Sequence, residues 1–221
     1  MRMVGILGGM GPAATLDLMA RVMAAVPAQD DRDHVPLMVD QNPQVPSRIA
    51  RLIEGDGEDP APVLADMARR LQGAGAQALA MACNTAHHYA DAVRDAVDIP
   101  FLDMVDIAAA HVPHGAEVAL LASPAVAQIG LYDAALATRG ATIRHPKADA
   151  ALDLIRHVKA RGPDAEAQAA FHRLSAQVGS DVQVIACTEF SLLAPHAAPG
   201  VQVDALDALV QEIVAFATAA G

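Results

Sequence analysis

The stretch Gln77–Thr85 reads QALAMACNT, and a second stretch, Asp181–Thr188, reads DVQVIACT. Each is an apolar run typical of a buried strand, and each ends in Ala-Cys followed by a polar residue. In open parallel sheets, ligands bind at the carboxyl ends of the strands. The repeated pattern therefore predicts two related α/β halves, each of which contributes one cysteine, Cys83 or Cys187, to a shared cleft.

Short apolar runs alternate with helical patterns along the rest of the chain, which predicts an α/β fold with mostly parallel sheets. In the first half we expect strands over Met3–Leu7, Val35–Val39, Ala76–Ala82 and Phe101–Met104, and helices over Pro12–Ala25, Pro62–Gln72 and Thr85–Ala96. In the second half we expect strands over Glu117–Leu121, Ala141–Arg144, Val182–Ala186 and Val201–Asp204, and helices over Ala125–Thr138, Ala148–Lys159, Asp164–Val178, Glu189–Leu193 and Leu206–Ala219. We expect an N-terminal domain of residues 1–104 and 206–221 and a C-terminal domain of residues 105–205.

The composition indicates an aliphatic core and disfavours nucleic acid and membranes as partners. Of the 221 residues, 53% are hydrophobic but only 3% are aromatic. A net charge of −11 without a basic patch opposes binding to nucleic acid or to anionic membranes. No run approaches the roughly 20 apolar residues of a membrane span, and the opening MRMVGILGGM lacks a secretory apolar region. We therefore expect a cytoplasmic protein whose two cysteines stay reduced.

The two cysteines have matched settings, each between a strand and a helix. A thiol at a helix N-terminus faces unsatisfied backbone N–H groups, which favour the thiolate and lower the thiol pKa. Asn84 or Thr85 after Cys83, and Thr188 after Cys187, are candidates for capping these helices. Two thiols on opposite faces of a carbon can take the α-proton of an amino acid and return a proton on the other side, which is racemisation without a cofactor. The alternative is a pair of buried cysteines that act only as small hydrophobic residues.

A glycine-rich turn follows the first predicted strand, where Gly8–Thr15 reads GGMGPAAT. Its exposed amides, at the start of the helix that Pro12 opens, predict a site for a carboxylate or a phosphate. The same turn contains the pattern GxGxxA from Gly9, which is a dinucleotide fingerprint, and Asp40 after the second strand could hold a ribose. A nicotinamide enzyme is therefore a rival interpretation, although nothing else in the sequence supplies a hydride-transfer site.

Three segments together resemble the aspartate racemase branch of the aspartate/glutamate racemase family. They are GILGGMGPAAT at Gly5–Thr15, MACNTAHH at Met81–His88 and IACTEFSLL at Ile185–Leu193. Their order and spacing agree over essentially the whole chain. The resemblance implies two pseudo-symmetric α/β domains with the active site in the interdomain cleft, activity without pyridoxal phosphate or metal, and a homodimer. It also implies that Cys83 and Cys187 are the catalytic pair.

The resemblance further implies a set of substrate-binding residues. Asn42–Arg48, NPQVPSR, resembles a family segment in which the arginine, here Arg48, binds a substrate carboxylate, and Lys159 resembles a second cation. The other substrate contacts expected are Met10, Gly11, Gln41, Asn84, Thr85, Ser123, Thr188 and Glu189. The chain departs from the family where Ser47 replaces an aspartate, and where the turn Ser123–Val126 lacks a second threonine.

Alternatives within and outside the family remain open from the sequence. Maleate-type isomerases and hydantoin racemases resemble the same fold, and a protein that only binds an amino acid would keep the cleft without the chemistry. His87 could tune the thiol pKa of Cys83 or, at four residues' separation, share a metal with it. No further ligands lie near in the sequence, so no metal is expected.

Overall fold

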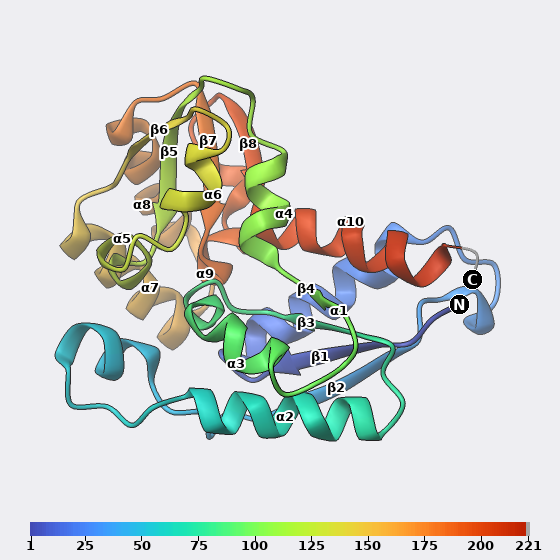
Figure 1. The fold of residues 1–221 in the computed structure, drawn as a ribbon. Coiled ribbons are helices and arrows are strands. Elements are labelled where there is room, and N and C mark those ends of the chain that lie inside the picture. The colour runs from blue at the N-terminus through green and yellow to red at the C-terminus, as the bar shows by residue number, and fades with distance from the viewer. Residues whose placement is uncertain (220–221) are drawn as a thin grey trace. The chain divides into compact units, whose positions relative to one another are not determined.

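The structure, a computed structural model, describes residues 1–219, which form two compact units (Figure 1). Unit 1 contains Met1–Met104 and the described residues from Asp207 onward, and unit 2 contains Val105–Leu206. The chain therefore enters unit 2 after Met104 and returns after Leu206; we call these two points the first and the second crossing. Each crossing lies in the first turn of a helix, α4 (Met104–Ala110) or α10 (Ala205–Thr218).

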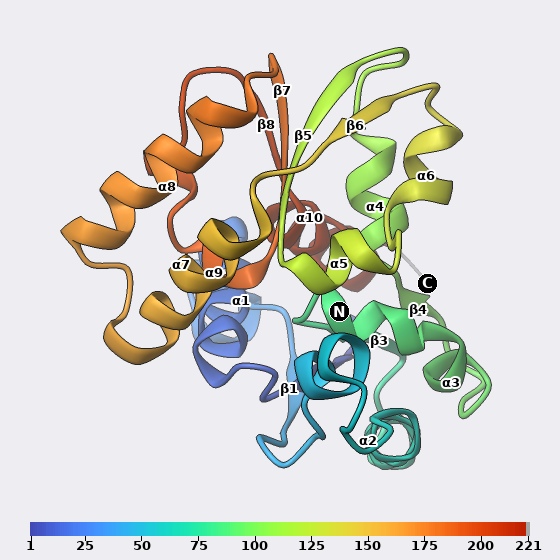
Figure 2. The same cartoon turned by 90° about the vertical axis from the view of Figure 1, so that its left-hand side faces the viewer.

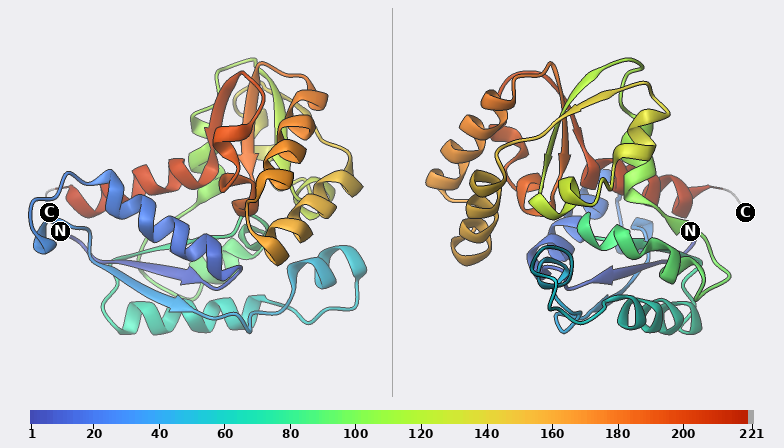
Figure 3. Two further views of the ribbon diagram at one scale, coloured as in Figure 1. Left: turned by 180° about the vertical axis from the view of Figure 1, so that it is seen from behind. Right: turned by 60° about the vertical axis from the view of Figure 1, so that its left-hand side comes forward.

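Unit 1 is built on a parallel sheet with the strand order β2-β1-β3-β4. Its strands are β1 (Val4–Gly8), β2 (Leu37–Gln41), β3 (Ala78–Met81) and β4 (Phe101–Leu102). Helices α2 (Ala61–Gly73) and α3 (Ala90–Arg94) lie on one face, and α1 (Pro12–Ala25) and α10 lie on the other (Figures 1 and 3). The central strands β1 and β3 are buried throughout, as expected for a sheet that is covered on both faces.

Unit 2 repeats this plan with the strand order β6-β5-β7-β8, again all parallel. Its strands are β5 (Glu117–Ala122), β6 (Thr142–Arg144), β7 (Val182–Ala186) and β8 (Val201–Asp204). Its helices after α4 are α5 (Pro124–Gln128), α6 (Asp133–Ala137), α7 (Ala148–Arg161), α8 (Ala165–Val178) and α9 (Thr188–Ser191). Helices α7 and α8 cover one face of the sheet, and α4 covers the other (Figure 2). The matching strand orders confirm the predicted α/β class with two similar halves.

Several predicted elements are correct to the residue, and others are divided by local geometry. Pro12–Ala25, Val182–Ala186 and Val201–Asp204 form as predicted. The single helix expected over Ala125–Thr138 is wrong, because the chain turns at Gly130, where φ is +60°, between α5 and α6. The helix expected over Thr85–Ala96 begins as a 3₁₀ segment over Thr85–Tyr89 and becomes α-helical only at α3.

Each unit has its own aliphatic core, and each core includes one cysteine. In unit 1, Cys83 packs with Leu7, Met10 and Met81, and in unit 2, Cys187 packs with Phe190 and other side chains. As expected from the low aromatic content, most of the buried side chains in both cores are aliphatic. No helix within residues 1–219 is both long enough and apolar enough to cross a membrane.

Candidate active site

Cys83 lies just beyond the carboxyl end of β3, beside the glycine turn that follows β1. The parallel register aligns Leu7 of β1 with Met81 of β3, so both strands end at the same edge of the sheet. The Ala82 amide donates to the Leu7 carbonyl at 3.3 Å and extends this pairing up to the cysteine. Cys83 is buried, with 6% exposure, in the cluster that also holds Met10. The glycine turn after β1 and the Cys83 segment after β3 therefore lie at the same edge of the sheet, as expected for parallel strands.

The glycine turn is packed against the chain after β2. Gly9 has a φ of +92°, and a Cβ there would lie 2.4 Å from the Asn42 carbonyl carbon, so only glycine fits. The Gly9 amide donates to the Thr15 hydroxyl at 2.9 Å. We expected the amides of this turn to be open to an anion. This is wrong for the Gly9 amide, because its hydrogen is already bonded to the Thr15 hydroxyl. The turn instead places the Met10 carbonyl 3.3 Å from Arg48 Nη2.

Arg48 is held by backbone carbonyls and, within the described residues 1–219, has no carboxylate partner. Its Nη1 donates to Pro46 O at 2.9 Å and Val45 O at 3.3 Å, and its Nη2 donates to Met10 O at 3.3 Å. Its Nε is buried without a hydrogen-bond partner, and within residues 1–219 it makes no ion pair. Neutral carbonyls orient a guanidinium without cancelling its charge, so Arg48 remains able to bind an anion.

Asp40 is engaged in a way that counts against the nicotinamide interpretation. Its carboxylate accepts from Arg70 Nε at 3.0 Å and Nη2 at 2.6 Å. A ribose would have to displace this bidentate pair. Gln41, the next residue and the last of β2, is exposed and aligned with Gly8.

Cys187 lies at the carboxyl end of β7 and hydrogen-bonds a carboxylate. Its thiol donates to Glu189 Oε2 at 3.2 Å, and the other oxygen, Oε1, lies 3.3 Å from Lys159 Nζ. Cys187 has 5% exposure and the Glu189 side chain 14%, so water screens this contact little. The carboxylate thus bridges a thiol and an ammonium group, and it joins three residues that the sequence predicted separately.

The predicted thiolate character of Cys187 is wrong. Burial, followed by the negative charge of Glu189 and the hydrogen bond to it, raises the pKa of the Cys187 thiol well above its ordinary value. The backbone amides of Glu189 and Phe190 act in the opposite direction, as a helix N-terminus should, but they are outweighed. Cys187 is therefore a thiol at neutral pH.

The helix caps predicted after the two cysteines form only in part. Asn84 occupies the N-cap position of the 3₁₀ segment without a side-chain cap hydrogen bond, and Cys187, not Thr188, occupies the N-cap position of α9. Thr188 is then the first residue of α9 and is buried, and Thr85 is half-buried at the start of the 3₁₀ segment. Asn84, Thr85 and Thr188 nevertheless directly follow the two cysteines in the sequence.

Ser123 caps a helix at the carboxyl end of β5. Its hydroxyl accepts from the Val126 amide at 3.4 Å, at the start of α5. The residue is buried, with 6% exposure. In this turn, which departs from the family pattern, the Ser123 hydroxyl therefore stabilises the start of α5.

Two further buried residues lie beside the cysteines: His87, which the sequence suggested as a group that tunes the Cys83 thiol, and Ser191, which it did not suggest. His87 Nδ1 lies 2.8 Å from the Cys83 carbonyl, and its Nε2 accepts from the Met104 amide at 3.1 Å. With both ring nitrogens occupied, His87 neither faces the thiol through a nitrogen nor is available to a metal. Ser191 Oγ lies 3.4 Å from the Cys187 carbonyl and 2.6 Å from Asp204 Oδ1. Both residues stand four positions after a cysteine, a spacing that was visible in the sequence.

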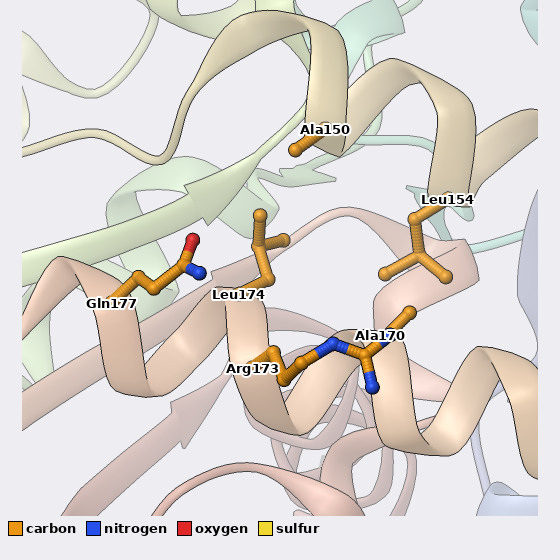
Figure 4. A pocket seen from close by; sticks show the side chains of 6 residues that line it. All are labelled: Ala150, Leu154, Ala170, Arg173, Leu174 and Gln177. Atoms are coloured by element: carbon orange, nitrogen blue, oxygen red, sulfur yellow. The ribbon is translucent and has the colours of Figure 1, made fainter.

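Two other features of unit 2 do not include the predicted site residues. A small hollow between α7 and α8 is lined by Ala150, Leu154, Ala170, Arg173, Leu174 and Gln177 (Figure 4). A cluster of His157, Asp164 and Glu166 has ligand atoms close enough together for a metal. Asp164 nevertheless caps α8 at the Ala167 amide, 2.9 Å away, and lies 2.8 Å from His157. These contacts, with the Ala167 hydrogen bond first, lower the pKa of Asp164 and explain the cluster without an ion.

Comparisons with known proteins agree over nearly the whole chain. The profile of the family described as Asp/Glu/Hydantoin racemase matches residues 7–213. The broad specificity amino-acid racemase RacX of Bacillus subtilis is 28% identical over 203 residues, which are 88% of each chain. The Picrophilus torridus aspartate racemase superposes with a TM-score of 0.87 at 26% identity, over 98% of this chain and 94% of that one. A glutamate racemase from Francisella tularensis in complex with D-glutamate shares the fold, with a TM-score of 0.68 at 16% identity over 97% and 80%.

Proposed function

Since the chain belongs to the Asp/Glu/hydantoin racemase family and is an isomerase, we propose that it inverts the configuration at Cα of an acidic amino acid, aspartate first and glutamate second. Cys83 and Cys187 are the acid–base pair, and no pyridoxal phosphate or metal takes part. One observation carries the proposal: two unbridged cysteines stand at equivalent strand ends of two sheets with the same strand order. The proposal includes a cytoplasmic location, where both thiols stay reduced, and a homodimer, which the family resemblance implies.

The contacts of the two thiols support different resting roles. Cys187 is buried against the Glu189 carboxylate, and both effects keep its proton in place. It is therefore the proton donor in the direction that begins with Cys83 as thiolate. Within residues 1–219, Cys83 has no carboxylate hydrogen-bonded to its sulfur. An exchange of protons across Cα needs one group that starts as the base and one that starts as the acid, and these contacts favour Cys187 as the acid.

The proposed reaction moves two protons and leaves no net change in the protein's charge. The Cys83 thiolate removes the α-proton, so that the Cα–H bond breaks, an S–H bond forms and the electron pair moves into the α-carboxylate. The Cys187 S–H bond then breaks as its proton reaches the opposite face of Cα. Cys83 ends as thiol and Cys187 as thiolate, and the reverse reaction uses these roles exchanged. Charge that develops on the carboxylate is stabilised by fixed donors and cations.

Arg48 is the group that best explains an acidic substrate. Its guanidinium is oriented by three carbonyl oxygens and keeps an unpartnered buried Nε, which suits a planar carboxylate. Lys159 is the second cation. Asn84, Thr85, Thr188 and Glu189, which flank the cysteines, and Met10, Gly11, Gln41 and Ser123, at the ends of neighbouring strands, complete the proposed substrate contacts.

A second candidate, racemisation of neutral amino acids, is favoured by the Lys159–Glu189 ion pair. This pair, at 3.3 Å, occupies Lys159, and Arg48 then remains as the cation for one carboxylate. An amino acid with a single carboxylate needs only one such cation. RacX, the relative described above, carries the description of a broad specificity amino-acid racemase.

Incubation of the purified enzyme in heavy water without cofactor tests the proposal. L- and D-aspartate and glutamate should each acquire deuterium at Cα and lose optical purity. Alanine, leucine and lysine, run in parallel, decide between the acidic and the broad substrate class. If no amino acid exchanges its α-proton in either enantiomeric form, the racemase proposal fails.

A further inference from the structure

The peptide of each cysteine is connected to a crossing between the units through the residue four positions later. His87 occupies this position after Cys83, and Ser191 occupies it after Cys187. Both are buried, with 4% and 1% exposure. A ring nitrogen of His87 and the hydroxyl oxygen of Ser191 lie 2.8 and 3.4 Å from the carbonyl oxygen of the respective cysteine, so each residue contacts the main chain of its cysteine.

The connection in unit 1 consists of two hydrogen bonds made by one imidazole. The Met104 amide can only donate, so His87 Nε2, 3.1 Å away, carries no hydrogen. The remaining hydrogen of a neutral ring is then on Nδ1, which donates to the Cys83 carbonyl at 2.8 Å. Met104 is the last residue before the first crossing and the first of α4. One rigid ring therefore fixes the Cys83 peptide to the start of the helix that leaves unit 1.

The connection in unit 2 uses a hydroxyl and a carboxylate. The Ser191 amide and hydroxyl lie 3.0 and 3.4 Å from the Cys187 carbonyl, and the hydroxyl donates to Asp204 Oδ1 at 2.6 Å. The same carboxylate oxygen accepts from the Leu206 amide at 3.0 Å. Leu206 is the last residue before the second crossing and lies in the first turn of α10. The acceptors at both crossings thus satisfy amides that a helix N-terminus leaves unpaired.

We propose that His87 and the Ser191–Asp204 pair are positioning residues, each of which holds one cysteine at a fixed place relative to the adjacent crossing. The two arrangements use different groups but share their order: a cysteine carbonyl, the residue four positions on, and a helical amide at the crossing. The carbonyl accepts from the imidazole in unit 1 and from the Ser191 backbone amide in unit 2. Proton transfer in both directions needs each sulfur within reach of Cα, and small displacements of a reacting group are costly. The proposal predicts that each connection affects its own cysteine and leaves the other unchanged.

Alkylation of single-cysteine variants tests this without reference to the substrate. The Cys187→Ser variant leaves only the Cys83 thiol for iodoacetamide, and Cys83→Ser leaves only Cys187. Adding His87→Leu, which fills much of the ring's volume but can form neither hydrogen bond, should raise the alkylation rate of Cys83 about threefold, the scale of one lost hydrogen bond, and leave that of Cys187 unchanged. Adding Ser191→Ala should do the reverse. Equal changes at both thiols, or none at either, would overturn the proposal.

Two further variants separate a connection from a local contact. His87→Asn keeps a donor near the Nδ1 position but offers nothing to the Met104 amide, so it should leave Cys83 as reactive as His87→Leu does. Full recovery in His87→Asn would show that the Cys83 carbonyl bond alone matters, and the link to the crossing would be wrong. His88→Ala is the matched control, because His88 is exposed and its ring packs on Tyr89. It should change neither thiol.

The activity arm of the test rests on the proposed function. In His87→Leu, kcat should fall while KM for aspartate stays near the wild-type value, because substrate contacts remain. The isotope effect with Cα-deuterated substrate should rise only for the enantiomer whose proton Cys83 removes, and Ser191→Ala should show it for the other enantiomer. Equal rises for both enantiomers would reduce His87 to a general structural role. An inactive wild type with the expected alkylation pattern would refute the racemase proposal and leave the positioning role intact.

Discussion

The two units offer the same pair of groups, one thiol and one cation, but engage them differently. In unit 2 a single carboxylate, Glu189, contacts both Cys187 and Lys159. In unit 1 neither Cys83 nor Arg48 has a carboxylate partner within residues 1–219. Similar backbones therefore place a thiol and a cation in different surroundings. One carboxylate, Glu189, contacts both groups in unit 2, and it accounts for the difference between the two units.

The largest expected effect comes from removing either thiol. Cys83→Ala and Cys187→Ala should each reduce racemisation about 10²- to 10⁴-fold, the range for loss of a positioned acid or base. The two variants should differ in exchange without inversion, which proton NMR in heavy water follows. Cys187→Ala keeps the Cys83 base and should exchange the α-proton of one enantiomer, and Cys83→Ala should exchange that of the other. Retention of wild-type racemisation by both variants would exclude the two-thiol mechanism.

Removing either cation, Arg48 or Lys159, should have a smaller effect than removing a thiol, and the effect on KM should be larger for Arg48. Arg48→Gln should raise KM for aspartate roughly 10- to 100-fold, because it removes a charged hydrogen-bonding group from an unpaired site. Lys159→Gln should raise KM less than about fivefold, because Lys159 is half-exposed and already paired with Glu189. Steady-state kinetics with aspartate and alanine measures both. A larger effect for Lys159 would mean that substrate displaces Glu189, and the comparison of the units would reverse.

The sequence was sufficient for the fold class and the family because both depend on patterns of backbone and apolar residues. The apolar runs at Val182–Ala186 and Val201–Asp204 are strands to the residue, and three motif segments led to the family that the whole-chain comparison confirms. The strand register then brings the glycine turn and Cys83 to one edge, as the strand–turn order predicted.

Side-chain partners could not be predicted in the same way, since they depend on rotamers and burial. The thiol of Cys187 was expected to be acidic from its helix N-terminus, but a carboxylate two residues later folds back onto it and raises its pKa. Thr15 takes the Gly9 amide, and His87 contacts a carbonyl instead of a thiol. In each case the competing partner is close in sequence, and only the three-dimensional path of the side chain decides between the alternatives.

The smallest expected effect is a pH shift at one thiol, produced by Glu189→Gln. Burial is the first cause of the raised pKa of Cys187 and persists in the variant, while the negative charge, the second cause, is removed. In the Cys83→Ser background, the alkylation midpoint of Cys187 should therefore move to lower pH but stay above the ordinary thiol value. The same substitution in the Cys187→Ser background is the matched control and should leave the midpoint of Cys83 in place.

The raised pKa of the Cys187 thiol should also make the stability of the folded protein depend on pH. The folded protein holds the Cys187 proton more tightly than the unfolded chain, whose thiol titrates near pH 9.0. The resulting stabilisation is fully present below that pH and is lost as the pH rises through the folded-state pKa. Melting temperatures of the wild type should thus fall more steeply above pH 9.0 than those of Glu189→Gln. Parallel curves, with an unmoved alkylation midpoint, would mean that Glu189 does not set the acid character of unit 2.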